Sequence, residues 1–286
     1  MRHAGGMTDA RTWRQCHADA LPLLLGLSGL GFAALQLALP AFIVPAALCA
    51  FLLGIPHGAV ERDGHGRRTR PPGLAYSTAY IVCGGAVLVL WVVAPWPVLV
   101  VSLALSAWHF AQSEWEPRGV GVFAVLACFA VFPELTLAQF SALTGHAPIV
   151  ETAWLRLLGL CGVAALWLSP GWRANWASRL VLTGLFLVLH PVAAVATYFL
   201  AWHSLGETAA LLDADSERAR PWRTLMHTYG RTALPALLGA AALLGGVYAG
   251  AVPVTLAAGL GVAFVVPHML PLERWLQRAH LKAALR

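Results

Sequence analysis

The sequence predicts an all-α integral membrane protein, a bundle of about ten transmembrane helices within a range of about eight to ten. Composition, the spacing of apolar runs and the placement of charge predict this class. Of the 286 residues, 59% are hydrophobic and 11% are charged, and the mean hydropathy is +0.69. Soluble domains are about a quarter charged and just under half apolar. The composition therefore excludes an ordinary soluble globule, a disordered chain and a disulfide-rich secreted module.

The polar N-terminal segment 1–19 is predicted to be a cytoplasmic tail ahead of the first apolar run. It carries arginines, as the start of a signal peptide does, but no cleavage site with a hydrophilic mature domain follows, so we expect the first run to be retained. Runs of membrane-spanning length then occur at 20–39, 41–60, 74–95, 97–115, 119–139, 153–169, 177–191, 192–212, 232–251 and 253–272.

The seventh run is short and meets the eighth at His190-Pro191. Proline interrupts helical hydrogen bonding, so this pair either kinks one long helix or separates two, and the helix count varies accordingly. The longest polar stretch, 213–231, is predicted to be the longest cytoplasmic loop. Because no soluble domain is inserted, residues 1–286 are expected to form a single integral membrane domain.

The basic residues predict the orientation of the bundle. The net charge is +6, and Lys282 is the only lysine among the 19 basic residues. If successive loops lie on alternate sides of the membrane, the basic residues gather on one side. That side carries the N-terminus, Arg62–Arg70, Glu116–Arg118, Arg173–Arg179, Asp213–Arg231 and Arg274–Arg286. The positive-inside bias makes this side, and both termini, cytoplasmic. We therefore predict a multi-pass protein of the cell inner membrane, with no nucleic-acid partner.

Four histidines near the ends of apolar runs are the candidate functional residues. Ionisable groups are costly in lipid and usually face a bundle interior, where they bind ions, relay protons or ligate metals. His57, His109, His203 and His268 fall on four different predicted helices. The predicted topology places all four at similar depth, toward the cytoplasmic side.

Two carboxylates accompany these histidines. Glu61 follows His57 by four residues, and Glu207 follows His203 by four, so each pair shares one helix face. Neutral imidazoles are ligands for iron, zinc or copper, and carboxylates favour iron over copper. Helix bundles build metal sites from inward-facing side chains of this kind. The sequence therefore predicts a metal site inside the bundle.

Two other functions fit the same histidine and glutamate cluster. A transmembrane haem protein would use two histidines as axial ligands, and a metal or proton transporter would place the same groups inside its bundle. The clustering at one depth argues against a proton relay, which needs polar groups spread across the bilayer. The remaining histidines, His17 among them, are expected to be solvated in tails or loops. His190 falls at the opposite end of its run from the cluster.

Four short motifs surround the histidines: Pro56-His57-Gly58-Ala59, Ser106-Ala107-Trp108-His109-Phe110-x-Gln112, Trp202-His203-Ser204 and Pro267-His268-Met269. In this order, over about residues 50–270, they resemble the bacterial Brp/Blh family of membrane β-carotene 15,15'-dioxygenases. The resemblance implies a non-haem iron dioxygenase that cleaves β-carotene or a related carotenoid with O₂ to retinal-type aldehydes. It also implies Fe²⁺ as the cofactor, and carotenoid, O₂ and the lipid bilayer as partners. The oligomeric state is left open.

The resemblance also implies roles for single residues. In the family pattern iron is assigned to the positions of His57 and His109 and to two histidines of a Trp-His-Ser-x-x-x-His element, of which His203 matches the first. This chain has Glu207 at the second position, and Glu61 where the family has an aspartate. The catalytic set implied is His57, His109, His203 and Glu207, and the same four residues together with His268 and Glu61 are the expected metal ligands.

Aromatic residues next to the histidines are the expected substrate-lining residues. Trp108 and Trp202 each immediately precede a histidine of the cluster. They could line a hydrophobic channel for a flat, conjugated molecule, and ordinary helix packing explains them equally well. The expected set is Trp108, Phe110, Tyr198, Phe199 and Trp202.

Overall fold

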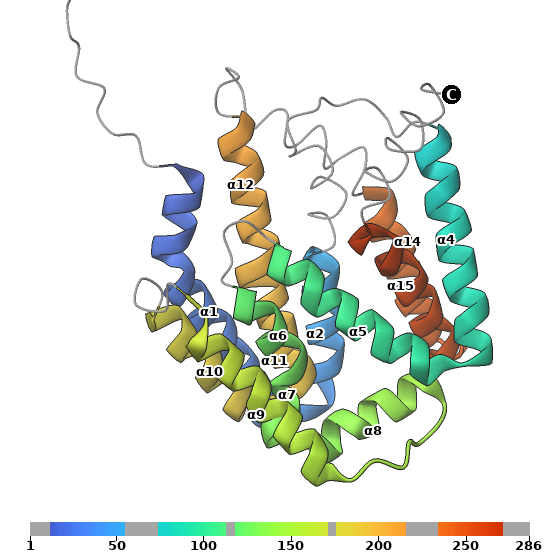
Figure 1. Cartoon of the computed structure of the whole chain (residues 1–286), viewed down its shortest axis with the longest axis horizontal. Coiled ribbons are helices and arrows are strands. Elements are labelled where there is room, and N and C mark those ends of the chain that lie inside the picture. The colour runs from blue at the N-terminus through green and yellow to red at the C-terminus, as the bar shows by residue number, and fades with distance from the viewer. Residues whose placement is uncertain (1–11, 55–73, 113–117, 171–175, 216–233, 271–286) are drawn as a thin grey trace, which may run out of the picture.

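The computed structural model describes residues 12–54, 74–112, 118–170, 176–215 and 234–270, and within these ranges the regular structure is entirely helical. The predicted all-α class is therefore confirmed. In chain order the elements are α1 (Trp13–Ala38), η1 (Pro40–Phe42), α2 (Ile43–Gly54), α4 (Leu74–Val93), α5 (Pro95–Gln112), α6 (Arg118–Leu126), α7 (Cys128–Val131), α8 (Pro133–Thr144), α9 (Thr152–Leu168), α10 (Trp176–Val188), α11 (Pro191–Thr197), η2 (Tyr198–Ser204), α12 (Leu205–Asp215), α14 (Leu234–Tyr248) and α15 (Val254–Met269) (Figure 1).

Most helices begin and end close to the limits of the predicted apolar runs. α10 ends at Val188 and α11 begins at Pro191, so the His190-Pro191 pair separates two helices instead of kinking one. Proline suits this first position because its missing N–H has no helical partner there. α1 starts earlier than its apolar run, at a capping box formed by Thr12 and Gln15. The last part of the predicted tail 1–19 is therefore helical.

One predicted apolar run is not a single helix. The run 119–139 is divided among α6, α7 and α8. Pro133 begins α8, which continues to Thr144 and ends at Gly145 with a φ of 75°. A proline cannot continue the preceding helix, so the chain changes direction, and α8 lies across the lower end of the molecule in Figure 1.

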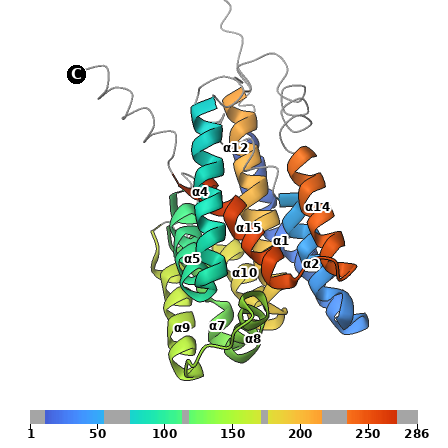
Figure 2. The same ribbon diagram turned by 90° about the vertical axis from the view of Figure 1, so that its right-hand side faces the viewer.

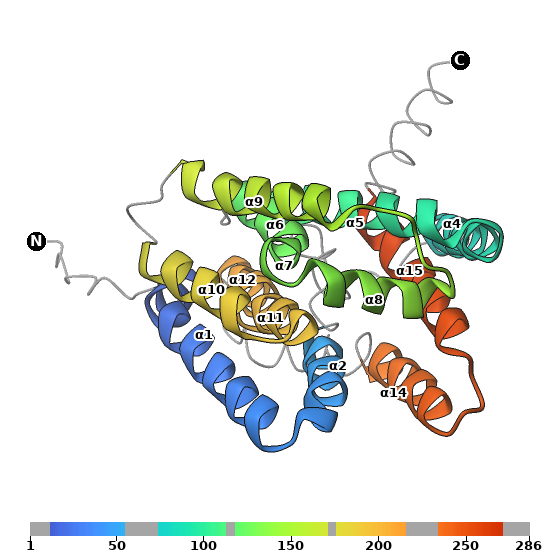
Figure 3. The same ribbon diagram turned by 90° about the horizontal axis from the view of Figure 1, so that it is seen from below.

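The helical segment from Pro191 to Asp215 runs through the middle of the molecule. Seen from below, α9, α5 and α4 form one outer row, α1, α2 and α14 the opposite one, and α11 and α12 lie between them (Figure 3). Viewed from the side, α4, α12 and α14 run roughly along one axis (Figure 2). The largest fully buried apolar side chains of the core come from η2, from α1, α6 and α9, and from α10 with the residue that follows it: Leu25, Val120, Phe123, Leu166, Leu182, Leu189, Tyr198 and Trp202.

Two of the described helices, α1 and α4, are long and apolar enough to cross a membrane. Only 17% and 6% of their most apolar windows is buried, so most of this apolar surface faces outward. Shorter apolar helices of 10–17 residues occur at Pro40–Phe51, Thr152–Leu168, Trp176–Val188, Leu237–Tyr248 and Val254–Met269. The count of about ten spans stays a prediction.

Arg179 lies inside α10 and is fully buried, which contradicts its assignment to a charged cytoplasmic loop. Its Nη1 donates to the carbonyls of Leu166 at 2.8 Å and Ser169 at 3.3 Å, and its Nη2 to that of Pro170 at 3.2 Å. The last carbonyls of a helix lack helical donors, and the dipole there favours a cation. The guanidinium therefore caps the end of α9 and joins it to α10.

Replacing Arg179 with methionine should destabilise the fold. The variant keeps an apolar stem of similar length but removes the guanidinium bonds to the carbonyls of Leu166, Ser169 and Pro170, while Ser169 Oγ still donates to Leu166. The expected loss in the free energy of unfolding is roughly 1–3 kcal/mol. Thermal unfolding of the purified protein in detergent measures it. Arg156→Met is the matched control, because the 3.1 Å ion pair of Arg156 with Glu134 is exposed and contributes less than about 1 kcal/mol. Equal effects of the two variants would contradict the capping role.

Candidate functional site

Three of the predicted histidines come together from three elements. His109 lies in the last turn of α5, His203 in η2, and His268 in the last turn of α15, directly after Pro267. The ring centroid of His109 is 5.6 Å from that of His203 and 5.1 Å from that of His268. The Nε2 atoms of all three rings are buried. Segments separated by more than 60 residues in the chain thus place imidazoles in one cluster, with His109 in the middle.

The middle segment departs from α-helical hydrogen bonding where it carries His203. η2 is a π-helix over Tyr198–Ser204, set between the α-helices α11 and α12. At its end the N–H of Leu205 donates to the carbonyl of Leu200, five residues back, and also to that of Trp202. Short π-helical turns of this kind occur mostly inside α-helices and often at functional sites. No composition or spacing signal in the sequence predicted this one.

The end of α2 packs against the same π-helix. Ser204, the residue after His203, donates from its Oγ to the carbonyl of Gly54 at 3.0 Å. The rings of Phe51 and Phe199 lie 5.4 Å apart. A side chain at Gly54 would overlap the ring of Phe199, so the two elements approach closely only because this residue is glycine. His57 and Glu61, the predicted site residues that follow α2, lie outside the described residues.

Aromatic rings surround His203. The centroid of Phe110 is 4.6 Å from that of His203, and that of Phe199 is 5.8 Å away. Tyr198 is stacked on His203 at 6.4 Å and meets Phe110 edge-on at 5.5 Å. Both His203 and Tyr198 are fully buried. The arrangement gives this imidazole an apolar, water-poor surrounding.

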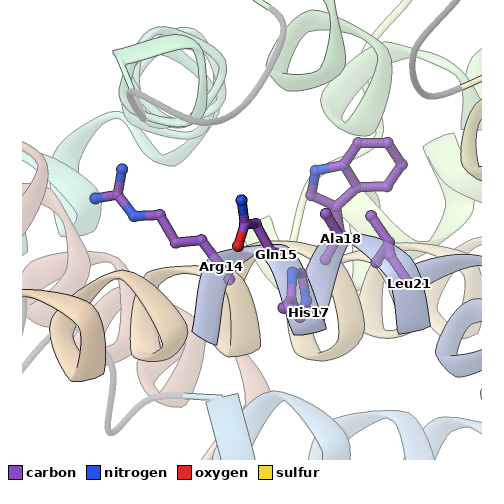
Figure 4. Close-up of a pocket in the computed structure, with 7 residues that line it drawn as sticks. Arg14, Gln15, His17, Ala18 and Leu21 are labelled. Atoms are coloured by element: carbon purple, nitrogen blue, oxygen red, sulfur yellow. The ribbon is translucent and has the colours of Figure 1, made fainter. Parts of the chain in front are cut away.

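The two predicted tryptophans lie elsewhere. Trp108 is 45% exposed, on the outer side of α5. Trp202 is buried, and it lines a cavity of about 230 Å³ between α1 and the π-helix, together with Arg14, Gln15, His17, Ala18, Leu21 and Gly206 (Figure 4). Glu207, in the first turn of α12, is half-buried one turn beyond His203.

His17 is a residue whose importance the sequence did not reveal. The expectation that it is solvated is wrong: it lies in α1, and its ring Nε2 donates to the carbonyl of Ala201 in the π-helix at 2.9 Å. His190 belongs to a separate polar group, in which its ring lies 3.1 Å from the Gln139 amide nitrogen and its backbone N–H donates to Gln36 at 2.8 Å. Neither partnership is visible in local sequence, because the partners are far apart in the chain.

The distances between the histidine rings match those expected for two imidazoles that bind the same metal. A metal–nitrogen bond of about 2 Å places the centroids of two ligand imidazoles roughly 5 Å apart, close to the separations around His109. Within the described ranges, however, no group of three or more His, Cys, Asp or Glu side chains is arranged to hold a metal ion. The described residues therefore supply imidazoles at ligand spacing without a complete set of donors.

Comparison with known proteins decides the family. A family model described as beta-carotene 15,15'-dioxygenase matches residues 48–275. This chain belongs to that family. The chain is 27% identical, over 322 aligned residues, to the probable beta-carotene 15,15'-dioxygenase Blh of Halobacterium salinarum. The alignment covers 93% of this chain and 91% of the relative. No solved structure matches this chain. Both the predicted family and the predicted class, a carotenoid-cleaving oxygenase, are confirmed.

Gly54→Ala should impair this family member at the site itself. The added methyl group overlaps the Phe199 ring, so this ring must leave its place beside His203. We expect carotenoid cleavage to fall about tenfold, and the free energy of unfolding to fall by roughly 1–3 kcal/mol. Product formation in membranes, scaled to the amount of protein, measures the first effect.

The matched control for this variant is Gly31→Ala in α1, where an added Cβ meets nothing within 4 Å. This variant should keep wild-type activity. Wild-type activity in Gly54→Ala would show that the close approach of α2 to the π-helix does not matter for the reaction.

Proposed function

We propose that the protein is an integral membrane, non-haem Fe²⁺ dioxygenase that cleaves β-carotene or a related carotenoid with O₂ to retinal-type aldehydes. The single observation that carries this proposal is the meeting of His109, His203 and His268 beside an aromatic wall, in a chain of the β-carotene 15,15'-dioxygenase family. Iron, when bound, supplies the electrons that let ground-state O₂ react with a polyene.

The proposed ligands combine described and undescribed residues. His109, His203 and His268 provide imidazoles whose Nε2 atoms are buried. His57 is the next proposed ligand, since it follows Gly54 by three residues and the chain limits their Cα separation to about 11 Å. Glu207 and Glu61 are the two candidate carboxylate ligands, and a carboxylate favours iron over copper. Three or four imidazoles with a carboxylate form an acceptable Fe²⁺ shell.

The surrounding side chains bind the substrate and keep water out. Phe110, Tyr198 and Phe199 lie around His203 and offer flat faces against which a conjugated chain can stack. The same rings exclude water, which protects reactive intermediates from side reactions. Trp202 backs this wall from the α1 side. Trp108, being exposed on α5, is placed to contact lipid or an entering carotenoid.

The bilayer is the natural source of such a substrate. A hydrocarbon layer of about 30 Å dissolves a long polyene. We place about ten helices across the inner membrane, with both termini cytoplasmic. The outward apolar surfaces of α1 and α4 and the gathering of arginines on one side support this placement.

The competing functions are less well supported. Two axial imidazoles on opposite faces of a haem have centroids roughly 6.5 Å apart with a macrocycle between them. The 5.6 and 5.1 Å separations leave no room for that plane between either pair. A transporter would not require an apolar aromatic wall around a single imidazole. The family match favours the oxygenase over both.

Expression in a β-carotene-producing bacterial host tests the reaction. We expect orange colour to fade and retinal to appear in the extract, and we expect His203→Ala and His109→Ala to reduce retinal at least a hundredfold. His146→Ala is the control, because that side chain is exposed and lies far along the chain from the cluster. Unchanged carotene with the wild-type protein present in the membrane would overturn carotenoid cleavage.

Metal analysis tests the cofactor. Purified protein should contain about one iron per chain and show no Soret absorption band. Glu207→Gln should weaken iron binding at least about tenfold, because it removes a proposed carboxylate ligand, and His203→Ala should abolish it. Iron retained in full by His203→Ala, or a Soret band in the wild-type protein, would refute the proposed site.

A further inference from the structure

The hydrogen bond between α1 and the π-helix joins two segments 184 residues apart. His17 donates from Nε2 to the carbonyl of Ala201, at 2.9 Å, and Ala201 is two residues before His203. Figure 4 shows His17 on α1 among the residues that line the cavity. A carbonyl oxygen can only accept, so the ring must carry its proton on Nε2 for this bond to form.

The π-helix changes the donors available to this carbonyl. In an α-helix the carbonyl of Ala201 would accept from the N–H of Leu205, four residues on. Here that N–H donates to the carbonyls of Leu200 and Trp202 instead. Ala201 is 2% exposed, so water does not replace the lost donor. His17 therefore supplies, from outside the helix, a hydrogen bond that favours the π-helical turn over the α-helical one.

Packing alone does not hold these two elements together at this point. The cavity of about 230 Å³ lies between α1 and the π-helix, with His17 and Trp202 both on its wall. The start of α1 is instead attached to α12 by polar contacts, since the Asp213 carboxylate accepts from the backbone N–H groups of Trp13 at 2.5 Å and Arg14 at 2.9 Å. These bonds attach the first turn of α1 to α12, ahead of His17 and separately from its bond to Ala201.

We propose that His17 is a positioning residue for the metal site. By donating to Ala201 it holds the π-helical turn that directs His203 toward His109, although His17 itself touches neither substrate nor metal. The inference rests on the proposed function. It goes beyond that function because it assigns a role to a residue on α1, outside the motifs that carry the histidine cluster.

Two variants at His17 and one at Asp213 test the proposal. His17→Leu removes the donor while keeping similar volume, His17→Gln retains an N–H donor at about the same reach, and Asp213→Ala loosens the start of α1 without touching the bond to Ala201. Each purified variant is titrated with Co²⁺, followed by its visible absorption, and assayed for carotenoid cleavage. Hydrogen exchange of the peptide that covers residues 198–206 is measured by mass spectrometry.

We expect His17→Leu to weaken Co²⁺ binding and to lower kcat at least tenfold, with faster exchange of the 198–206 peptide. His17→Gln should recover both values to within about threefold of wild type, well short of the roughly 10–100-fold losses that follow removal of an outer partner of a metal ligand. Asp213→Ala should lower the melting temperature while Co²⁺ affinity stays within about threefold. Loss of Co²⁺ binding in Asp213→Ala equal to that in His17→Leu would overturn the positioning role, as would no recovery with glutamine.

The wild-type measurements separate this inference from the proposed function. Wild-type protein that binds no metal and cleaves no carotenoid refutes the proposed function, whatever the variants do. Active, metal-binding wild type together with an unaffected His17→Leu refutes only the inference. Unchanged hydrogen exchange in His17→Leu refutes the claim that His17 holds the π-helix, independently of metal and activity.

Discussion

The candidate site depends on one change in backbone hydrogen bonding. A π-helical turn within an α-helix acts as an inserted residue, and each residue of a helix turns the following side chains by about 100°. In the helical segment from Pro191 to Asp215 this turn brings His203 against Phe110 and His109, while Trp202 faces α1. The same turn allows Ser204 to reach the end of α2. A continuous α-helix through this segment would direct these neighbours differently.

An apolar bundle has little water to satisfy backbone groups that an irregular turn exposes, so the protein supplies the partners itself. The carbonyls of Gly54 and Ala201 receive side-chain donors from Ser204 and His17. The end of α9 receives a guanidinium for the same reason. The first two donors come from segments distant in sequence, and they connect the outer helices to the central one.

Much of the fold could be predicted from the sequence, because the length of an apolar run largely determines where a helix can begin and end. The segments that carry His109, His203 and His268 could also be identified, since ionisable groups stand out against an apolar background. The break at Pro133 was missed because hydrophobicity continues across it. The π-helix and the roles of His17 and Arg179 could not be predicted, because they depend on contacts across the bundle and not on local pattern.

Arg179 has a consequence for the order in which the fold can assemble. A charged group buried in an apolar interior is costly unless it has partners, and α10 carries a fully buried arginine in its first turn. The acceptors of its Nη1 and Nη2 all lie at the end of the preceding helix, 9 to 13 residues away in the chain. The guanidinium therefore finds these partners within a local pair of helices, α9 and α10, without waiting for a segment that is distant in sequence.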